Sequence, residues 1–294
     1  MQNSTLAIAR NHTGTPPPSV WSAGWRRLRR WALAQLPPAL QDLKFTRYYL
    51  KYGEPELRLV PLLCHPLRDA IDIGANEGMY THLMRRHARQ VYAFEALPVL
   101  AEKLDARRYR HVTVRCCALS DRAGTGTLYT PLYGDTAVYG LSSLQADMPQ
   151  LHPACTTQPV RLVRLDDVYA GNVGCIKIDV EGHELAVLRG AQQTIARYKP
   201  NLLIETEENI APGALAGIDA MLRPLGYAGY YLYHDQLRDL TAFNAFALQD
   251  PRNIAGFRPG LRRSDFPDFV SNFIFIAASD LKLQRALAKA AARR

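Results

Sequence analysis

The residues with the clearest chemical potential form a turn, Asp72-Ile73-Gly74-Ala75-Asn76-Glu77-Gly78, between an apolar run and an amphipathic stretch. A strand, a glycine-containing turn and a helix in this order are typical of the place where α/β proteins hold nucleotide-like cofactors. A dinucleotide fingerprint needs a middle glycine, which lets the backbone approach the pyrophosphate. Asn76 stands at that position, so the turn disfavours a dinucleotide.

The acids at this turn favour a cationic cofactor. Asp72 precedes the turn and Glu77 lies within it, and their carboxylates would repel a pyrophosphate. S-adenosylmethionine carries a sulfonium and an ammonium group, so these acids favour it over NAD. An ordinary strand-to-helix turn with a solvated Glu77 is the structural alternative.

A further acid, Glu95, closes the next apolar segment, 95 − 72 = 23 residues after Asp72. Nucleotide-binding folds place a ribose-binding acid roughly 20 residues after the first-strand turn. One carboxylate can accept hydrogen bonds from both ribose hydroxyls and so fix the nucleoside. The alternative is an exposed acid before a helix that begins at Pro98, where negative charge is favoured anyway.

A second group of chemically capable residues follows the apolar run Cys175–Ile178, namely Asp179, Glu181, His183 and Glu184. Ligands of parallel sheets bind at the carboxyl ends of strands, so we expect this group beside the first turn. A hydroxyl loses its proton when its oxygen attacks a methyl group, and a histidine suits that task. His183 is therefore the first candidate base, and Asp179 is expected to orient cofactor or substrate. A helix N-terminus enriched in acids would explain Glu184 alone.

Alternating strands and helices must position these groups. The expected strands are Asp69–Ile73, Gln90–Phe94, Val112–Cys116, Cys175–Asp179, Leu202–Glu205, Tyr227–Leu232 and Asn272–Ile276. The expected helices are Met79–His87, Leu97–Ala106, Glu184–Tyr198 and Leu215–Leu225. This alternation predicts an α/β fold, a parallel sheet with helices on both faces.

Two further polar residues lie at strand ends. Glu205 closes the fifth expected strand, and His234 follows the sixth. His234 opens a stretch rich in Pro, Asn and Arg, residues 235–270, that shows no helical pattern. Such a long insert in a compact domain is usually functional, so it predicts a lid or substrate loop.

The length of 294 residues fits one large domain with extensions. We expect a disordered leader at 1–18, an amphipathic Trp/Arg helix at 19–42, the catalytic domain at 43–280 and a basic helix or tail at 281–294. Residues 19–36 fit a peripheral membrane contact, packing on the chain's own domain, or packing on a second copy as a homo-oligomer.

Charge and cysteine content narrow the class of protein. The net charge is +9, with basic clusters near both ends and arginines in the insert, which favours an anionic or lipid-linked acceptor. No nucleic-acid-binding motif accompanies this charge, so we expect no nucleic-acid partner. Five scattered cysteines without zinc-ligand spacing predict free thiols, a cytoplasmic protein and no metal site.

Together these segments resemble the FkbM family of S-adenosylmethionine-dependent methyltransferases. The matching pieces are Tyr52–Leu57, Asp72–Gly78, Phe94-Glu95, Ala118–Asp121, Ser142–Leu144, Val163–Asp166, Ile176–Glu184 and Leu188–Ala191. They cover about residues 45–280. The resemblance implies a Rossmann-like, seven-stranded methyltransferase sheet, mostly parallel with an antiparallel last strand. It also implies methyl transfer to a hydroxyl, often on a sugar, glycan or natural product.

The resemblance also assigns roles to residues. The turn from Asp72 to Gly78 would hold the methionine part of the cofactor, Glu95 its ribose, and Asp179 would stand near the transferred methyl. Adenine would be flanked by Ala118, Leu119 and Ser120. The acceptor pocket and the base are not fixed by it. Candidate substrate contacts are Ser142, Ser143, Glu181, Glu205 and His234.

Other classes of function stay open at this stage. The chain could be a cofactor-binding scaffold or a membrane adaptor that acts through its Trp/Arg helix. An NAD-dependent oxidoreductase is disfavoured by Asn76. A metal-assisted reaction through Asp179, Glu181 and Glu205 is conceivable, but no ligand spacing demands it.

Overall fold

The computed structural model describes residues 38–256 and 261–292. The predicted leader and residues 19–37 of the predicted Trp/Arg helix lie outside this part. Residues 38–42 begin the first described helix, α3 (Pro38–Tyr52), which is followed by η1 (Pro55–Leu59) and α4 (Val60–Leu63). Within the described residues, no helix has the length and apolar character that crossing a membrane requires.

A mixed sheet of eight strands forms the centre, in the order β11-β10-β12-β9-β8-β1-β2-β3. Its strands are β1 (Asp69–Ile73), β2 (Val91–Glu95), β3 (Val112–Cys116), β8 (Val173–Ile178), β9 (Asn201–Glu205), β10 (Tyr227–Tyr233), β11 (Gln236–Asp239) and β12 (Asn272–Ala277). The five strands from β9 to β3 pair in parallel, whereas β12 runs antiparallel to β9 and β10. After β3 the chain crosses to β8 on the other side of β1. This reversal creates a switch point, the usual ligand site of such sheets.

The predicted count of seven strands is wrong, because β11 adds an eighth. It pairs antiparallel with β10 through a turn at His234 and Asp235, both of which have positive φ. Two consecutive positive-φ residues suit a tight hairpin turn. The Gln236–Asp239 strand is polar and largely exposed, so it lacked the apolar pattern that marked the other strands.

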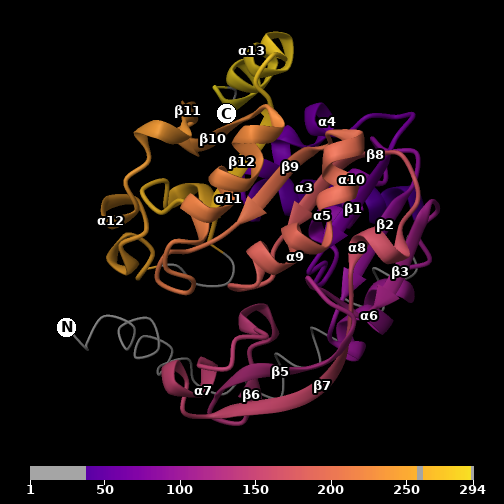
Figure 1. Ribbon diagram of the computed structural model, residues 1–294, viewed down its shortest axis with the longest axis vertical. Coiled ribbons are helices and arrows are strands. Elements are labelled where there is room, and N and C mark those ends of the chain that lie inside the picture. Colours follow the sequence, from indigo (N-terminus) through magenta and orange to yellow (C-terminus); the bar gives the residue numbers. More distant parts are fainter. Residues whose placement is uncertain (1–37, 257–260, 293–294) are drawn as a thin grey trace.

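A second, smaller sheet was also missed. It contains β4 (Ala118–Leu119), β5 (Gly124–Tyr133), β6 (Thr136–Ala137) and β7 (Cys155–Val163), in the order β4-β7-β5-β6. Figure 1 shows β5, β6 and β7 as a layer of their own, below the main sheet in that view. Their threonine-rich, only partly buried sequences gave no apolar alternation.

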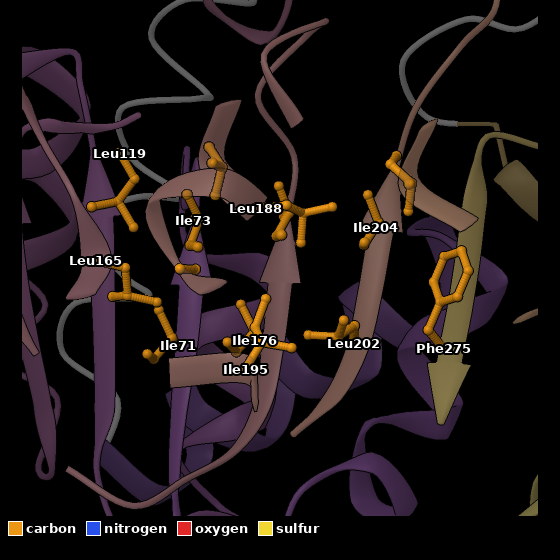
Figure 2. Close-up of a cluster of buried hydrophobic side chains, with 14 of the residues drawn as sticks. Ile71, Ile73, Leu119, Leu165, Ile176, Leu188, Ile195, Leu202, Ile204 and Phe275 are labelled. Carbon is orange, nitrogen blue, oxygen red and sulfur yellow. The ribbon is translucent and has the colours of Figure 1, made fainter. Parts of the chain in front are cut away.

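Helices cover both faces of the main sheet, as predicted. One face packs on α9 (Glu184–Gly190), α10 (Gln192–Tyr198) and α11 (Ala214–Leu222) through Ile71, Ile176 and Phe275 among others. Figure 2 shows Ile71, Ile176 and Phe275 in one buried cluster with Leu188 and Ile195. The opposite face packs on α3, α4, α5 (Met79–Met84) and α13 (Leu281–Ala291). The remaining helices of four residues or more are α6 (Pro98–Asp105), α7 (Met148–Leu151), α8 (Leu165–Val168) and α12 (Ala245–Leu248).

The single helix predicted over Glu184–Tyr198 is two helices, because the chain breaks at Ala191. Just before the break, a Cβ on Gly190 would lie 1.9 Å from the carbonyl oxygen of Ser120. Just after it, the carboxylate of Asp166 accepts hydrogen bonds from the backbone of Gln193 and Thr194. Asp166 thus caps the N-terminus of α10 from another part of the chain. This cap explains why one amphipathic pattern contains a boundary between two helices.

A substitution at Gly74 tests how closely the backbone after β1 approaches the backbone after β8. Its φ is +74°, and a Cβ there would lie 1.7 Å from the carbonyl oxygen of Asp179. Gly213 has a similar φ of +80° but nothing within 4 Å, so it isolates the backbone cost. We expect Gly213→Ala to cost about 1 kcal/mol of unfolding free energy and Gly74→Ala about 4 kcal/mol or more, measured by urea denaturation. Equal losses would contradict the close contact.

Candidate active site

One cavity opens at the switch point, where the ends of β1, β2 and β8 meet the small sheet. We call it the switch-point cavity. It is lined by Ile73, Gly74, Asn76, Phe94, Glu95, Ala96, Leu97, Leu100, Cys117, Ala118, Leu119, Leu128, Tyr139, Gly140, Ser142, Leu144, Asp179, Val180, Glu181 and His183. Parts of the segments that were predicted to bind the cofactor, represented by Gly74, Glu95, Ala118 and Asp179, therefore border one space.

Glu95 is fixed at the wall of this cavity by the backbone around it. Its Oε2 accepts a hydrogen bond from the N–H of Asn76 at 2.7 Å, and its Oε1 accepts from the N–H of Leu97 at 2.8 Å. Burial raises the pKa of Glu95, and the two backbone donors oppose that shift. Each oxygen keeps a further lone pair, so the carboxylate is pre-oriented to accept hydrogen bonds from a ligand.

Not every residue of the turn reaches the cavity. Asp72 is buried on the other side of β1, where Thr81 donates to its Oδ2 at 2.5 Å and burial raises its pKa. Glu77 is exposed and does not line the cavity. Gly78 packs against α6, where a Cβ would lie 2.3 Å from Leu104. Within the turn, Ile73, Gly74 and Asn76 provide the cavity's surface.

The small sheet covers the cavity from the far side. The connection between β6 and β7 adds Tyr139 and Ser142, and the hydroxyl of Ser142 lies 2.8 Å from that of Thr130 in β5. The next residue, Ser143, donates to the carbonyl oxygen of Glu181 at 2.5 Å, so it ties this cover to the loop after β8. Gln145 reinforces the tie through the carbonyl oxygen of Gly182 at 2.9 Å. Ser143 and Gln145 thus hold the cover in place.

His183 lies at the end of the cavity where β4 enters. Its Nε2 is 2.9 Å from the hydroxyl oxygen of Ser120, which directly follows β4. Burial lowers the pKa of His183, the charge of Arg122 lowers it further, and Asp121 opposes the shift. The imidazole is therefore neutral near pH 7, but one of its nitrogens is already engaged.

The residue that sequence analysis missed is Lys177, which is fully buried inside β8. Its Nζ donates to the Oδ1 of Asn272 at 2.9 Å and lies 3.3 Å from Glu205 and 3.8 Å from Asp179. Burial alone would lower its pKa, but Asp179, Glu205 and Glu54 outweigh burial and raise it. A lysine within the otherwise apolar run Cys175–Ile178 was the signal that could have revealed it.

The carboxyl groups around Lys177 have pKa values that shift in different directions. Burial and the charge of Glu205 raise the pKa of Asp179 well above its usual range, and burial with Asp179 does the same for Glu181. Burial also acts on Glu205, but Lys177 and the hydroxyl of Ser271, 3.0 Å away, outweigh it and lower its pKa. Within residues 38–256 and 261–292, no three acidic, histidine or cysteine side chains are arranged as metal ligands.

A second cavity, of about 480 Å³, lies on the other side of this network. Its floor includes Glu54 and Asn272, whose Nδ2 donates to the Oε2 of Glu54 at 2.9 Å. Tyr80 donates to the same oxygen at 2.6 Å. His234 lies at the rim of this second cavity, 2.6 Å from Asp268, and is not part of the switch-point cavity.

Two arginines of the insert have partners within the chain and are therefore less available to bind an anionic acceptor. Arg252 forms an ion pair with Asp250, and Arg263 donates to the carbonyl oxygens of Phe266 and Phe269. Arg258 lies outside the described residues. Arg262 is exposed at the rim of the second cavity.

A family model described as "Methyltransferase FkbM domain" matches residues 72–230, more than half of the chain. The chain belongs to the FkbM methyltransferase family. The matched range contains the turn, Glu95, the small sheet and the Asp179–Glu184 segment. The resemblance seen in the sequence is thereby confirmed.

Several solved structures are similar to this FkbM-family chain. An FkbM methyltransferase from Methylobacillus flagellatus shares 16% identity over 87% of this chain and 60% of its own, with a TM-score of 0.45. An rRNA methylase from Streptococcus thermophilus shares 8% over 76% and 95%, with a TM-score of 0.41. A Streptococcus mutans protein in complex with SAH shares 10% over 75% and 94%, with a TM-score of 0.39. The chain spans about 60% of the Methylobacillus protein, and no curated protein matches it.

Glu56, at the floor of the second cavity, makes the stability of this FkbM-family protein depend on pH. Burial and the neighbouring Glu54 raise its pKa from 4.5 to about 7. The folded state therefore keeps a proton that the unfolded state releases, so this contribution to stability is present below about pH 4.5 and is lost as the pH rises through about 7.

Replacing Glu56 with glutamine removes that loss. We expect Glu56→Gln to raise the unfolding free energy at pH 8 by about 3 kcal/mol and to change it little at pH 5, measured by urea denaturation. Glu102→Gln, at an exposed position of α6, is the control and should show no such difference. An equal effect of Glu56→Gln at both pH values would contradict the raised pKa.

Proposed function

We propose that the protein is an S-adenosylmethionine-dependent O-methyltransferase whose acceptor is a hydroxyl of a sugar, a glycan or a natural product. The observation that carries the proposal is the Glu95 carboxylate, held by the N–H groups of Asn76 and Leu97 at the switch point of the sheet. A carboxylate so placed in a nucleotide-binding fold suits ribose hydroxyls.

The residues around the switch-point cavity fit this cofactor. Gly74 and Asn76 offer close backbone approach, because both have positive φ and no bulky side chain. Ala118 and Leu119 give an apolar slot of the kind that adenine fills. The carboxyl groups of Asp179 and Glu181 line the same cavity, where a cationic group would favour their ionised form. When bound, the cofactor supplies an electrophilic methyl group on a positively charged sulfur.

Asp179 is the group best placed to take the acceptor's proton. It lines the switch-point cavity, and its contact with Lys177 leads directly to the second cavity. Its raised pKa brings it nearer to the operating pH, which improves a general base. His183 lines the same cavity, but its Nε2 already contacts the hydroxyl of Ser120. This contact suits a structural role at the end of the cavity where the cofactor would bind. Positioning of the two reactants supplies the larger part of the rate.

The cofactor assignment is tested by replacing Glu95. Glu95→Ala removes two charged acceptors of ribose hydroxyls, so we expect S-adenosylmethionine affinity to fall about 100-fold or more in calorimetry. Glu102→Ala, in the helix that follows, removes an equally charged but exposed side chain and should leave affinity unchanged. Undiminished binding by Glu95→Ala would exclude the ribose role.

The base is tested by comparing Asp179→Asn with His183→Ala. We expect Asp179→Asn to lower kcat by about 10²–10⁴-fold and to remove the pH-rate limb of the carboxyl, which should titrate above the usual aspartate range. His183→Ala should lower kcat less than tenfold. Should His183→Ala have the larger effect while S-adenosylmethionine affinity stays intact, His183 is the base instead.

A further inference from the structure

Helix α3 leaves large apolar side chains in contact with solvent. Four of them are each between 49% and 52% exposed, namely Leu40, Leu43, Tyr48 and Leu50. The other side of the helix packs on the main sheet's core, where Tyr49 is buried. Single exposed apolar residues are common on protein surfaces, whereas several on one 15-residue helix mark an interaction surface.

The exposed side of α3 also carries positive charge. Lys44, Arg47 and Lys51 are exposed, and no acidic side chain in the described part of the chain forms an ion pair with them. Asp42 is the single acid of this helix, and it already pairs with Arg85 of the core-facing side. The cations of α3 are therefore available to an anionic partner.

Helical spacing places these side chains in two rows. Leu43 and Leu50 are seven residues apart, so they lie on one line two turns apart, and Lys44 and Lys51 form a parallel line beside them. Arg47 lies between the upper and lower pairs. A helix at a membrane interface has this pattern, with leucines among the acyl chains and cations at the headgroups. We call the exposed set the α3 face, which comprises Leu40, Leu43, Lys44, Arg47, Leu50 and Lys51.

The residues before α3 have a composition of the same kind. Residues 1–37 lie outside the described part of the chain, and their sequence contains five arginines, all three tryptophans and no acid. Residues 1–52 together hold eight cationic side chains and one acidic side chain, so they account for seven of the nine net charges. Tryptophan and arginine suit the boundary between headgroups and acyl chains.

Charge and apolar exposure together select the partner. A second copy docked through the same face would bring like charges together, and residues 1–37 have no acid with which to neutralise this face. A nucleic acid would bind the cations through its phosphates but would leave the leucines in water. An anionic phospholipid surface neutralises the cations and also removes the leucines from water.

We propose that the α3 face, extended by residues 1–37, docks the protein on a membrane that contains anionic phospholipid. The contact is peripheral, because the leucines reach only the boundary of the acyl chains. Leu50 and Lys51 also line the second cavity, as does the exposed Arg262. Docking therefore brings the rim of that cavity next to the lipid headgroups.

Vesicle co-sedimentation of the full chain tests the proposal. The vesicles are phosphatidylcholine alone, and phosphatidylcholine with an equal part of phosphatidylglycerol. We expect the chain to bind the anionic vesicles about tenfold or more tightly than the neutral ones, and this preference should weaken at high salt. No binding to the anionic vesicles, or equal binding to both kinds, would overturn the proposal.

A pair of charge variants locates the contact. Each cation near an anionic membrane strengthens binding about fivefold, so Lys44→Gln with Lys51→Gln should weaken anionic-vesicle binding about 20-fold. The control is Arg189→Gln with Arg197→Gln, which removes the same charge from exposed positions of α9 and α10 on the opposite face of the main sheet. The control should change binding by no more than about twofold, because those sites lie beyond the screening length. Equal losses in the two variants would refute the α3 face.

The leucine row is tested separately from the cations. Leu43→Gln keeps a good helix former but removes apolar surface, so it should weaken anionic-vesicle binding about fivefold. Leu67→Gln makes the same change at an exposed leucine outside α3 and should have no effect. Urea denaturation of each variant checks that the fold is retained.

The competing partners give different results. If Leu43→Gln leaves vesicle binding unchanged, and a single-stranded oligonucleotide binds with the same loss in the lysine variant, then the surface is a nucleic-acid site. If light scattering shows a dimer that Leu43→Gln dissociates, while vesicles are not bound, then a second copy covers the helix. If only deletion of residues 1–37 abolishes vesicle binding, then α3 takes no part. Each of these three results would overturn the proposal.

Discussion

The structure around both cavities depends on the burial of one ammonium group. Lys177 lies inside the central strand β8, where an unpaired charge would be too costly to keep. Glu205, Asp179 and Asn272 compensate it from three directions, and each belongs to a different strand or strand end. Removing one member of such a buried group typically costs about 3–5 kcal/mol, because the others are left uncompensated. The same contacts therefore hold β8, β9 and β12 in register and place the acids of the site.

Excess negative charge around this lysine has a chemical purpose in the proposed reaction. Several carboxylates face a single ammonium, and burial keeps their pKa values high except at Glu205. A cationic cofactor entering the switch-point cavity would favour the ionised form of these acids. Cofactor binding thus lowers the pKa values of these acids and increases the share of ionised carboxylate that can accept the proton that a hydroxyl loses.

The main sheet could be predicted from sequence because its strands are apolar and its turns carry glycine. All seven predicted strands are present, and Glu95 and Asp179 lie where strand ends predicted them. The small sheet could not be predicted, since β5 and β7 are threonine-rich and pair with each other across a long connection. Lys177 was missed for a different reason. Its role depends on Asn272, which is 95 residues away in the chain, and no local pattern carries that information.

The contact between Gly74 and the carbonyl oxygen of Asp179 has a meaning for other members of the family. It joins the cofactor turn to the loop that bears the proposed base, at the one place where both strands end. No side chain fits there without separating β1 from β8. Position 74 is therefore diagnostic of this geometry. A homologue with any residue other than glycine there cannot keep the approach that brings the methyl donor and the proposed base together, even if the rest of its sequence is similar.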